Sequence, residues 1–205
     1  MTEATYVVFD TETTGLFDFK LPADAEGQPR LASVAFILAD AEGNEIDAIS
    51  HCVQPDGWSM PAEAQAVNGL TDEHLAENGI PVKRILDIYE DFIERGLIFV
   101  AFNAQFDMKV LRAEMRRAGR NDRFDQTRNS CAMRSCKPYQ DAGLAMRRGQ
   151  YVKLEEACAF FGIENPEAHN ALHDARAALG ILQRLLADGN LQEPKVHYAK
   201  NKPAA

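Results

Sequence analysis

The chain has 205 residues, a net charge of −9, and hydrophobic residues over 46% of its length. This length suits one domain with a sizeable core, and the charge argues against a protein that coats nucleic acid by electrostatics alone. No stretch approaches the ~18 apolar residues of a membrane helix, and the N-terminus lacks the features of a secretory signal.

The four cysteines show neither a complete zinc pattern nor a disulfide framework, so we expect reduced thiols in a cytoplasmic protein. Positive charge is concentrated in residues 109–153, which hold 12 Lys and Arg against 4 Asp and Glu, while the remainder holds 10 against 27. This basic segment is either a solvated helix face and loop or a phosphate-binding flank beside an acidic site. Composition leaves both interpretations open.

In chain order, the hydrophobic pattern predicts a strand at 5–10, hairpin strands at 31–40 and 46–54, helices at 61–66, 71–77 and 81–95, a strand at 97–102, a helix at 103–118, a weak strand at 129–133, and helices at 154–161 and 170–187. Thr71 and Asn103 are candidate N-caps. Three strands followed by alternating helices and strands predict an α/β fold with an antiparallel hairpin in a mixed sheet. We expect one domain over residues 1–193 and a basic, flexible tail over residues 194–205.

Asp10 and Glu12 end the first predicted strand, whose preceding residues are apolar. With a strand period of two, both side chains point to the same face, roughly 7 Å apart along the chain. Two like charges at the end of a buried strand repel and are poorly solvated, and a divalent cation would remove that conflict. The plainer interpretation is a strand that has reached solvent.

Two further acids lie in the first turns of predicted helices. Asp174 is the only charge on an apolar stripe of the last helix, and Asp107 lies beside apolar residues after Asn103. The helix dipole alone could favour both. His169 precedes the last helix if Asn170 is its N-cap, and it could then reach the same site as a proton acceptor. His173 is expected to lie exposed beside Asp174.

Three segments resemble the motifs of the DEDD 3′–5′ exonucleases. They are Phe9-Asp10-Thr11-Glu12-Thr13-Thr14-Gly15, Asn103-Ala104-Gln105-Phe106-Asp107, and His169-Asn170-Ala171-Leu172-His173-Asp174. The third has the histidine form, His-x4-Asp, which makes the chain similar to the DEDDh (DnaQ-like) branch. The resemblance covers about residues 5–188, and it implies an RNase H-like fold with a five-stranded mixed sheet flanked by α-helices.

The resemblance also implies hydrolysis assisted by two Mg²⁺ or Mn²⁺ ions. Asp10, Glu12, Asp107 and Asp174 would hold the ions, and His169 would take the proton of the attacking water. Oxygen-only ligands suit these hard ions better than zinc. The residues implied to hold the terminal nucleotide are Thr13, Leu16, Val67, Asn68, Asn103 and Phe106. Phe102 and Asn68 stand where the family commonly has histidine, so substrate preference is less secure than the chemistry.

The expected reaction is therefore release of nucleoside 5′-monophosphates from the 3′ end of single-stranded DNA. An exoribonuclease acting on short RNA or RNA 3′ ends has the same motifs, and a non-catalytic nucleic-acid-binding module is the alternative from another class. Binding alone would not require all five residues of the catalytic set. A homodimer and association with a polymerase are compatible with the resemblance, and no feature of the sequence indicates either.

Overall fold

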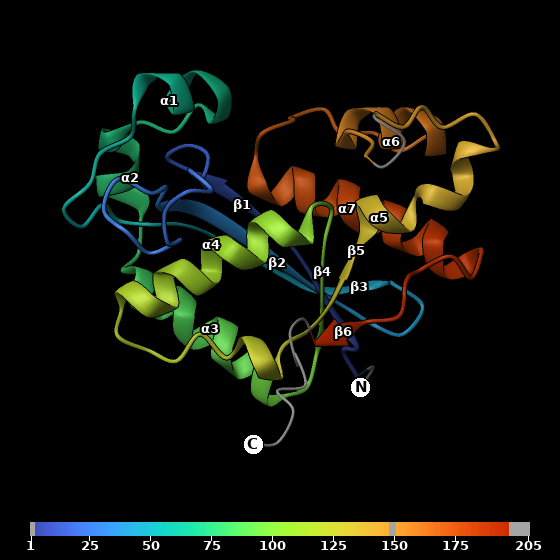
Figure 1. The fold of residues 1–205 in the computed structure, drawn as a ribbon, viewed down its shortest axis with the longest axis horizontal. Coiled ribbons are helices and arrows are strands. Elements are labelled where there is room, and N and C mark those ends of the chain that lie inside the picture. Colours follow the sequence, from blue (N-terminus) through green and yellow to red (C-terminus); the bar gives the residue numbers. More distant parts are fainter. Residues whose placement is uncertain (1–2, 148–150, 197–205) are drawn as a thin grey trace.

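The computed structural model describes residues 3–147 and 151–196, which form a central mixed sheet (Figure 1). Its strands are β1 (Tyr6–Thr13), β2 (Leu31–Ala39), β3 (Glu45–Cys52), β4 (Ile98–Ala101), β5 (Arg128–Cys131) and β6 (Lys195–Val196). Their order across the sheet is β3-β2-β1-β4-β5-β6. The first three strands pair antiparallel, β1, β4 and β5 run parallel, and β6 is antiparallel to β5. The mixed sheet is confirmed, with one short strand more than the five expected.

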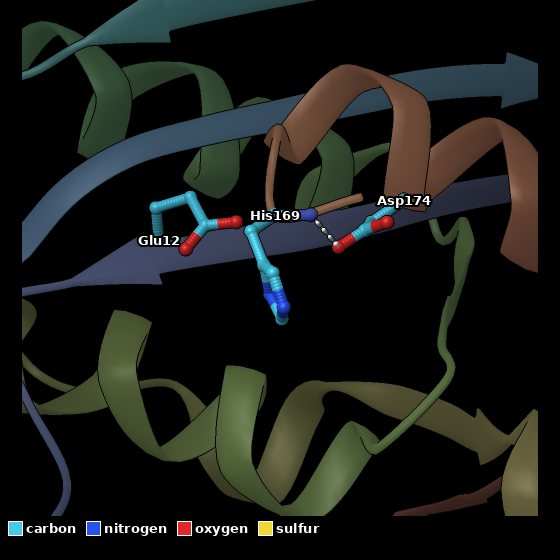
Figure 2. A group of neighbouring side chains, drawn as sticks. All are labelled: Glu12, His169 and Asp174. Carbon is cyan, nitrogen blue, oxygen red and sulfur yellow. Dashed lines mark hydrogen bonds between the residues drawn. The ribbon is translucent and has the colours of Figure 1, made fainter. Parts of the chain in front are cut away.

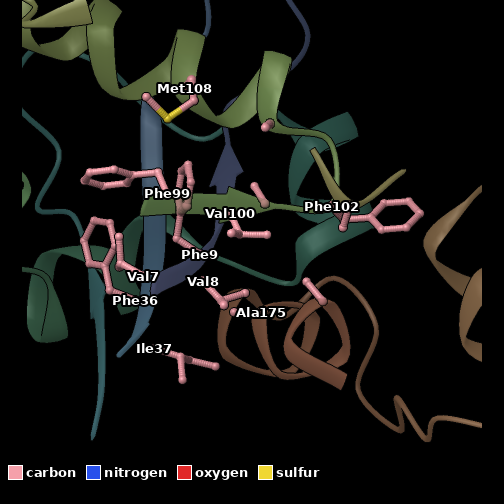
Figure 3. Packing of buried hydrophobic residues seen from close by; sticks show 14 of the residues in the cluster. Val7, Val8, Phe9, Phe36, Ile37, Phe99, Val100, Phe102, Met108 and Ala175 are labelled. Atoms are coloured by element: carbon pink, nitrogen blue, oxygen red, sulfur yellow. The ribbon is translucent and has the colours of Figure 1, made fainter. Parts of the chain in front are cut away.

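Helices flank this sheet, as the sequence predicts. They are α1 (Ala62–Asn68), α2 (Asp72–Asn78), α3 (Val82–Glu94), α4 (Ala104–Arg117), α5 (Ala132–Ser135), α6 (Leu154–Phe161) and α7 (Ala171–Ala187). Two short 3₁₀ turns cover Phe124–Gln126 and Lys137–Gln140. Helices α4 and α7 lie on opposite faces of the sheet (Figures 1 and 3). Among the described helices, none has the length and apolar character needed to cross a membrane.

Two of the three candidate N-caps, Thr71 and Asn170, form a capping hydrogen bond. Thr71 Oγ1 accepts a hydrogen bond from His74 N at 3.1 Å, and Asn170 Oδ1 accepts one from Leu172 N at 3.1 Å. Asn103 precedes α4 as predicted, but its exposed side chain makes no capping hydrogen bond. The position of this helix start was therefore predicted correctly, whereas the expected cap at Asn103 was wrong.

Strand β1 is central, and its alternating side chains contact both helical layers. Phe9 lies on the α4 face, where its ring centroid is 5.8 Å from that of Phe99, and Val8 lies on the α7 face near Ala175 (Figure 3). Both Phe9 and Val8 are fully buried. Continued alternation places Thr11 on the α4 face and its two neighbouring acids on the α7 face. The end of β1 thus presents polar groups to both layers.

The sixth strand lies in the segment expected to be a tail. Lys195 pairs with Asn129, and Val196 pairs with Arg128. The sheet therefore extends past residue 193. Residues 197–205 lie outside the described part of the chain, so the boundary and the character of the tail stay predictions.

Candidate active site

Three elements bring the expected acids to the end of β1. Asp10 and Glu12 lie on β1, Asp107 in the first turn of α4, and Asp174 in the first turn of α7. The negative charges of the other three carboxylates all raise the pKa of Asp10, so the four groups share one electrostatic site. Motifs separated by more than 160 residues in sequence therefore meet in space.

Asp107 is fixed by the strand rather than by its own helix. It is buried, and its Oδ1 accepts hydrogen bonds from Thr11 N at 3.2 Å and Thr11 Oγ1 at 2.7 Å. Because Thr11 points to the α4 face of the sheet, its side chain can contact the carboxylate of Asp107 in the helical layer on that face. Both bonds favour the ionised form of Asp107. Thr11 therefore orients one of the four acids.

Asp174 is fixed by the loop that precedes α7. This buried carboxylate accepts a hydrogen bond from Asn165 Nδ2 at 2.6 Å through Oδ1 and one from His169 N at 3.1 Å through Oδ2. The Asn170 cap begins the helix, so Asp174 lies one turn inside it and faces the sheet. The same acid thereby positions the neighbouring histidine backbone.

His169 is exposed and lies between two of the acids (Figure 2). One ligand atom from each of Glu12, His169 and Asp174 lies within 4.8 Å of the other two. The backbone of His169 has φ 67°, a left-handed conformation that non-glycine residues rarely adopt. Its N–H bond to Asp174 helps to hold this conformation. The backbone of His169 is thus held beside Asp174, with a ring nitrogen within 4.8 Å of both carboxylates.

His173 does not join this group. It lies within α7, is half-buried, and approaches Glu167 Oε2 with its Nε2 at 3.6 Å. The expectation that His173 is exposed was wrong, because its side chain is only 29% exposed. The two histidines of the third motif therefore have different environments.

The charge state of the acids indicates a site suited to cations. Burial raises the pKa of Asp10 well above its usual range, and burial followed by the charges of Asp174 and Asp107 raises the pKa of Glu12 to about 8. Burial also raises the pKa of Asp107 to about 7, in spite of its bonds to Thr11. Clustered carboxylate oxygens are the donors that hard divalent ions prefer. The residues present fit such ions.

The metal-free protein is expected to lose stability as the pH rises from about 5 to about 8. In the unfolded chain these carboxyls ionise near pH 4, whereas folding raises the pKa of Glu12 to about 8 and that of Asp107 to about 7. In this window the folded state binds more protons than the unfolded state, so raising the pH favours unfolding. Thermal unfolding in EDTA should give a lower Tm at the alkaline end. Glu12→Gln should shrink the difference, and a Tm that rises with pH would contradict the raised pKa values.

The residues expected to hold the terminal nucleotide have contrasting surroundings. Leu16 and Val67 are 85% and 56% exposed, so both apolar side chains are accessible to a ligand. Asn68 Nδ2 donates to the carbonyl of Thr13 at 3.2 Å, so it links the α1–α2 corner to the end of β1. Phe106 is half-buried beside Asp107. Their contacts with substrate stay a prediction.

The two departures from the family pattern differ in their structural consequences. Phe102 is buried in the hydrophobic core, and its carbonyl accepts a hydrogen bond from Met133 N at 2.9 Å. Asn68 instead makes the polar link to Thr13.

Sequence reasoning missed Thr11 and Asn165, which hold the acids. The alternation of β1 could have indicated Thr11, whereas no local pattern distinguishes Asn165 from an ordinary loop residue.

Comparisons with known proteins agree with this geometry. The exonuclease family model RNase_T matches residues 7–182. "Uncharacterized exonuclease CP81" of Escherichia phage 186 is 32% identical over 190 residues, which cover 89% of each chain. DNA polymerase III subunit epsilon of Treponema pallidum is 28% identical over 184 residues, which cover 89% of this chain and 76% of the relative.

A solved structure shows the same fold. E. coli exonuclease I in complex with a dT13 oligonucleotide superposes with a TM-score of 0.75 at 20% identity, covering 89% of this chain and 41% of exonuclease I. The chain thus spans less than half of exonuclease I, and at this identity the likeness concerns the fold alone. The family match extends over most of the chain and includes all three motifs. This protein therefore belongs to the DEDDh 3′–5′ exonuclease family of the RNase H-like superfamily.

Proposed function

We propose that this exonuclease releases nucleoside 5′-monophosphates, one at a time, from the 3′ end of single-stranded DNA. The observation that carries the proposal is the convergence of four carboxylates and His169 at the end of β1. A binding module would gain nothing from burying mutually repelling acids, because they would repel the phosphates it has to hold. In catalysis that uses divalent cations, these acids would serve as the ligands of the cations.

Two divalent ions, Mg²⁺ or Mn²⁺, are the proposed cofactors. Asp10, Glu12, Asp107 and Asp174 would hold them, since all four offer oxygen ligands at one site. When bound, such ions supply positive charge that offsets the negative charge developing on the phosphate and on the leaving oxygen. Thr11 and Asn165 would keep two of the acids in position through their hydrogen bonds.

His169 is the proposed general base. Its imidazole is exposed to solvent and lies beside Glu12 and Asp174, so it can accept a proton from a water molecule at the site. As the water oxygen forms a bond to phosphorus, the bond from phosphorus to the 3′ oxygen of the preceding nucleotide breaks. The products are a nucleoside 5′-monophosphate and a strand with a new 3′ hydroxyl.

Single-stranded DNA is the proposed substrate, in preference to RNA. E. coli exonuclease I, which shares the fold, binds a dT13 oligonucleotide, and the epsilon relative is a subunit of a DNA polymerase. The exposed apolar side chains of Leu16 and Val67 would contact an unpaired terminal nucleotide. Thr13, Asn68, Asn103 and Phe106 complete the proposed contact set.

The deciding experiment measures nucleotide release from 3′-labelled single-stranded DNA and RNA of equal sequence, with Mg²⁺, with Mn²⁺ and with EDTA. We expect metal-dependent release of mononucleotides, faster from DNA. Protein with Asp174→Ala, prepared in parallel, controls for a contaminating nuclease. Release of mononucleotides chiefly from RNA would reverse the substrate assignment. No release from either strand with either metal would overturn the proposal in favour of a binding module.

A further inference from the structure

The positive charge of the basic segment is mostly neutralised by local partners. Seven of its twelve Lys and Arg side chains form ion pairs within 4.0 Å, namely Arg112, Arg116, Arg117, Arg120, Arg123, Arg147 and Lys153. In the described part of residues 109–153, Lys109, Arg128, Arg134 and Lys137 have no acidic partner within that distance. Most cations of the described part of the segment are thus ion-paired, whereas these four have no acidic partner there; Arg148 lies outside the described residues.

Two of these four cations, Lys109 and Arg134, line one groove. It encloses about 820 Å³ between α4, strand β5 and the segment before β6, includes Asn103 and Phe106 in its lining, and contains none of the four catalytic acids. Arg134 Nη2 donates to Gln105 Oε1 at 2.9 Å, one helical turn before Lys109. The groove therefore leads away from the active site and carries available positive charge.

Aromatic rings accompany this charge. Lys109 Nζ lies 4.1 Å from the ring centroid of Phe17 and 4.7 Å from that of Phe19. Phe17 is buried and packs edge-on against Phe106, with ring centroids 5.6 Å apart. Phe19 is 82% exposed, so most of its ring surface stays open to solvent. A continuous row thus runs from Phe106 at the active site to an open ring.

The loop that carries Phe19 is held in place rather than left to fold back. Buried Gln28 accepts a hydrogen bond from Asp18 N at 2.9 Å and donates to the carbonyls of Asp18 at 2.8 Å and Pro22 at 3.0 Å. Beyond it, Arg30 forms an ion pair with buried Glu114 of α4 at 2.9 Å. The loop from Asp18 to Gln28 is therefore held by its own hydrogen bonds while the ring of Phe19 stays exposed and accessible to a ligand.

The chemistry of the row fits a nucleotide. A planar base stacks on an open aromatic face, an adjacent ammonium group pairs with a phosphate, and neither contact depends on base identity. A base inside a duplex has both faces covered by its neighbours, whereas a single strand can turn an unstacked base onto Phe19. Charge complementarity also favours nucleic acid, because Lys109 and Arg134 are unpaired cations in a protein with a net charge of −9.

We propose that Phe19 and Lys109 form a platform for a nucleotide on the 5′ side of the cleaved bond. The base stacks on the Phe19 ring, a neighbouring phosphate lies against Lys109, and Arg134 contacts the strand farther along the groove. This inference rests on the proposed exonuclease function and narrows its substrate class to unpaired strands that extend several nucleotides beyond the active site.

Phe19→Ala is expected to raise KM for a single strand of about 15 nucleotides roughly tenfold, with kcat at saturation unchanged. Phe19→Trp should restore the wild-type KM, because the indole also stacks. Leu21→Ala is the matched control, since Leu21 is an exposed apolar residue of the same loop that does not line the groove. An unchanged KM in Phe19→Ala, with the wild type active on the same strand, would overturn the platform and leave the proposed function standing.

Single abasic sites placed along the strand test stacking directly. In the wild type, an abasic site at one particular position upstream of the 3′ end should raise KM about as much as Phe19→Ala does. In the Phe19→Ala variant, the same abasic site should cause little further increase in KM. Lys109→Ala should lower the slope of log KM against log salt by about one, whereas the exposed control Lys83→Ala should not. If KM were equally sensitive to an abasic site at every position in both proteins, this would contradict a defined platform. Failure of the wild type to cleave any strand would instead contradict the proposed function.

Discussion

Asp10→Asn is expected to lower the rate of nucleotide release at least about 10³-fold while leaving the fold intact. The amide keeps the size of the carboxylate but cannot supply the negative charge that holds a divalent ion. Asp10 is the acid whose pKa is affected by all three of the others, so it lies at the electrostatic centre of the site. Single-turnover release from labelled single-stranded DNA in Mg²⁺ measures the loss. Asp174→Ala should have a comparable effect.

The stability of the same variant separates a lost ligand from a lost fold. Removing one of four mutually repelling charges should leave the Tm of the metal-free protein unchanged or raised at alkaline pH. Added Mg²⁺ should then stabilise the variant less than it stabilises the wild type. Asp40→Asn is a matched control, because Asp40 is a buried acid that instead organises the β2–β3 hairpin through Asn44. Normal release by Asp10→Asn would refute the metal-ligand assignment.

The fold was predictable because hydrophobic periodicity and local capping agree along the chain. The buried first half of β1, the Thr71 and Asn170 caps, and helix α6 at Leu154–Phe161 all follow from the local sequence. Strand β6 was missed because Lys195 and Val196 form a pairing two residues long, and its partner β5 is distant in sequence. Such pairing depends on whether the chain comes back to the edge of the sheet, and the local sequence pattern does not encode this.

The acids of the site were predictable because a charged side chain in each of these apolar surroundings costs free energy. A charged residue at the end of a buried strand or on an apolar helix stripe conflicts with its surroundings, and Asp10 and Asp174 show this conflict in the sequence. The groups that hold them were not predictable. Asn165 reaches Asp174 from a loop whose course is set by tertiary packing, and a polar loop residue is unremarkable in sequence.

The basic segment shows the same limit in its charges. Its surplus predicted either a solvated face or a phosphate-binding flank, and the structure shows that most of its described cations form ion pairs with acids. Arg120, for example, pairs with Asp87 and Glu90 of α3 and stabilises the contact between helices. Lys109 stays unpaired against the rings of Phe17 and Phe19. Net charge along the sequence cannot separate these cases, because the partners come from other elements.

His169→Ala is expected to lower kcat by about 10²- to 10³-fold, since the attacking water loses its proton acceptor. The carboxylates stay in place, so the affinity for Mn²⁺ should change far less than the rate. Rates under single-turnover conditions and Mn²⁺ affinity from titration would be measured on the same preparation. His173→Ala is the matched control, because it removes an imidazole from the same motif that lies outside the acidic group.

The ratio of the two effects decides the role of His169. Its ring nitrogen lies within 4.8 Å of oxygens of Glu12 and Asp174, a position from which it could either bind a cation or accept a proton. Hard ions favour the carboxylates over a neutral imidazole, which argues for the proton. A large loss of rate with nearly unchanged metal affinity supports a general base. Equal losses of both would make His169 a metal ligand, and an unchanged rate would assign the proton transfer to another group at the end of β1.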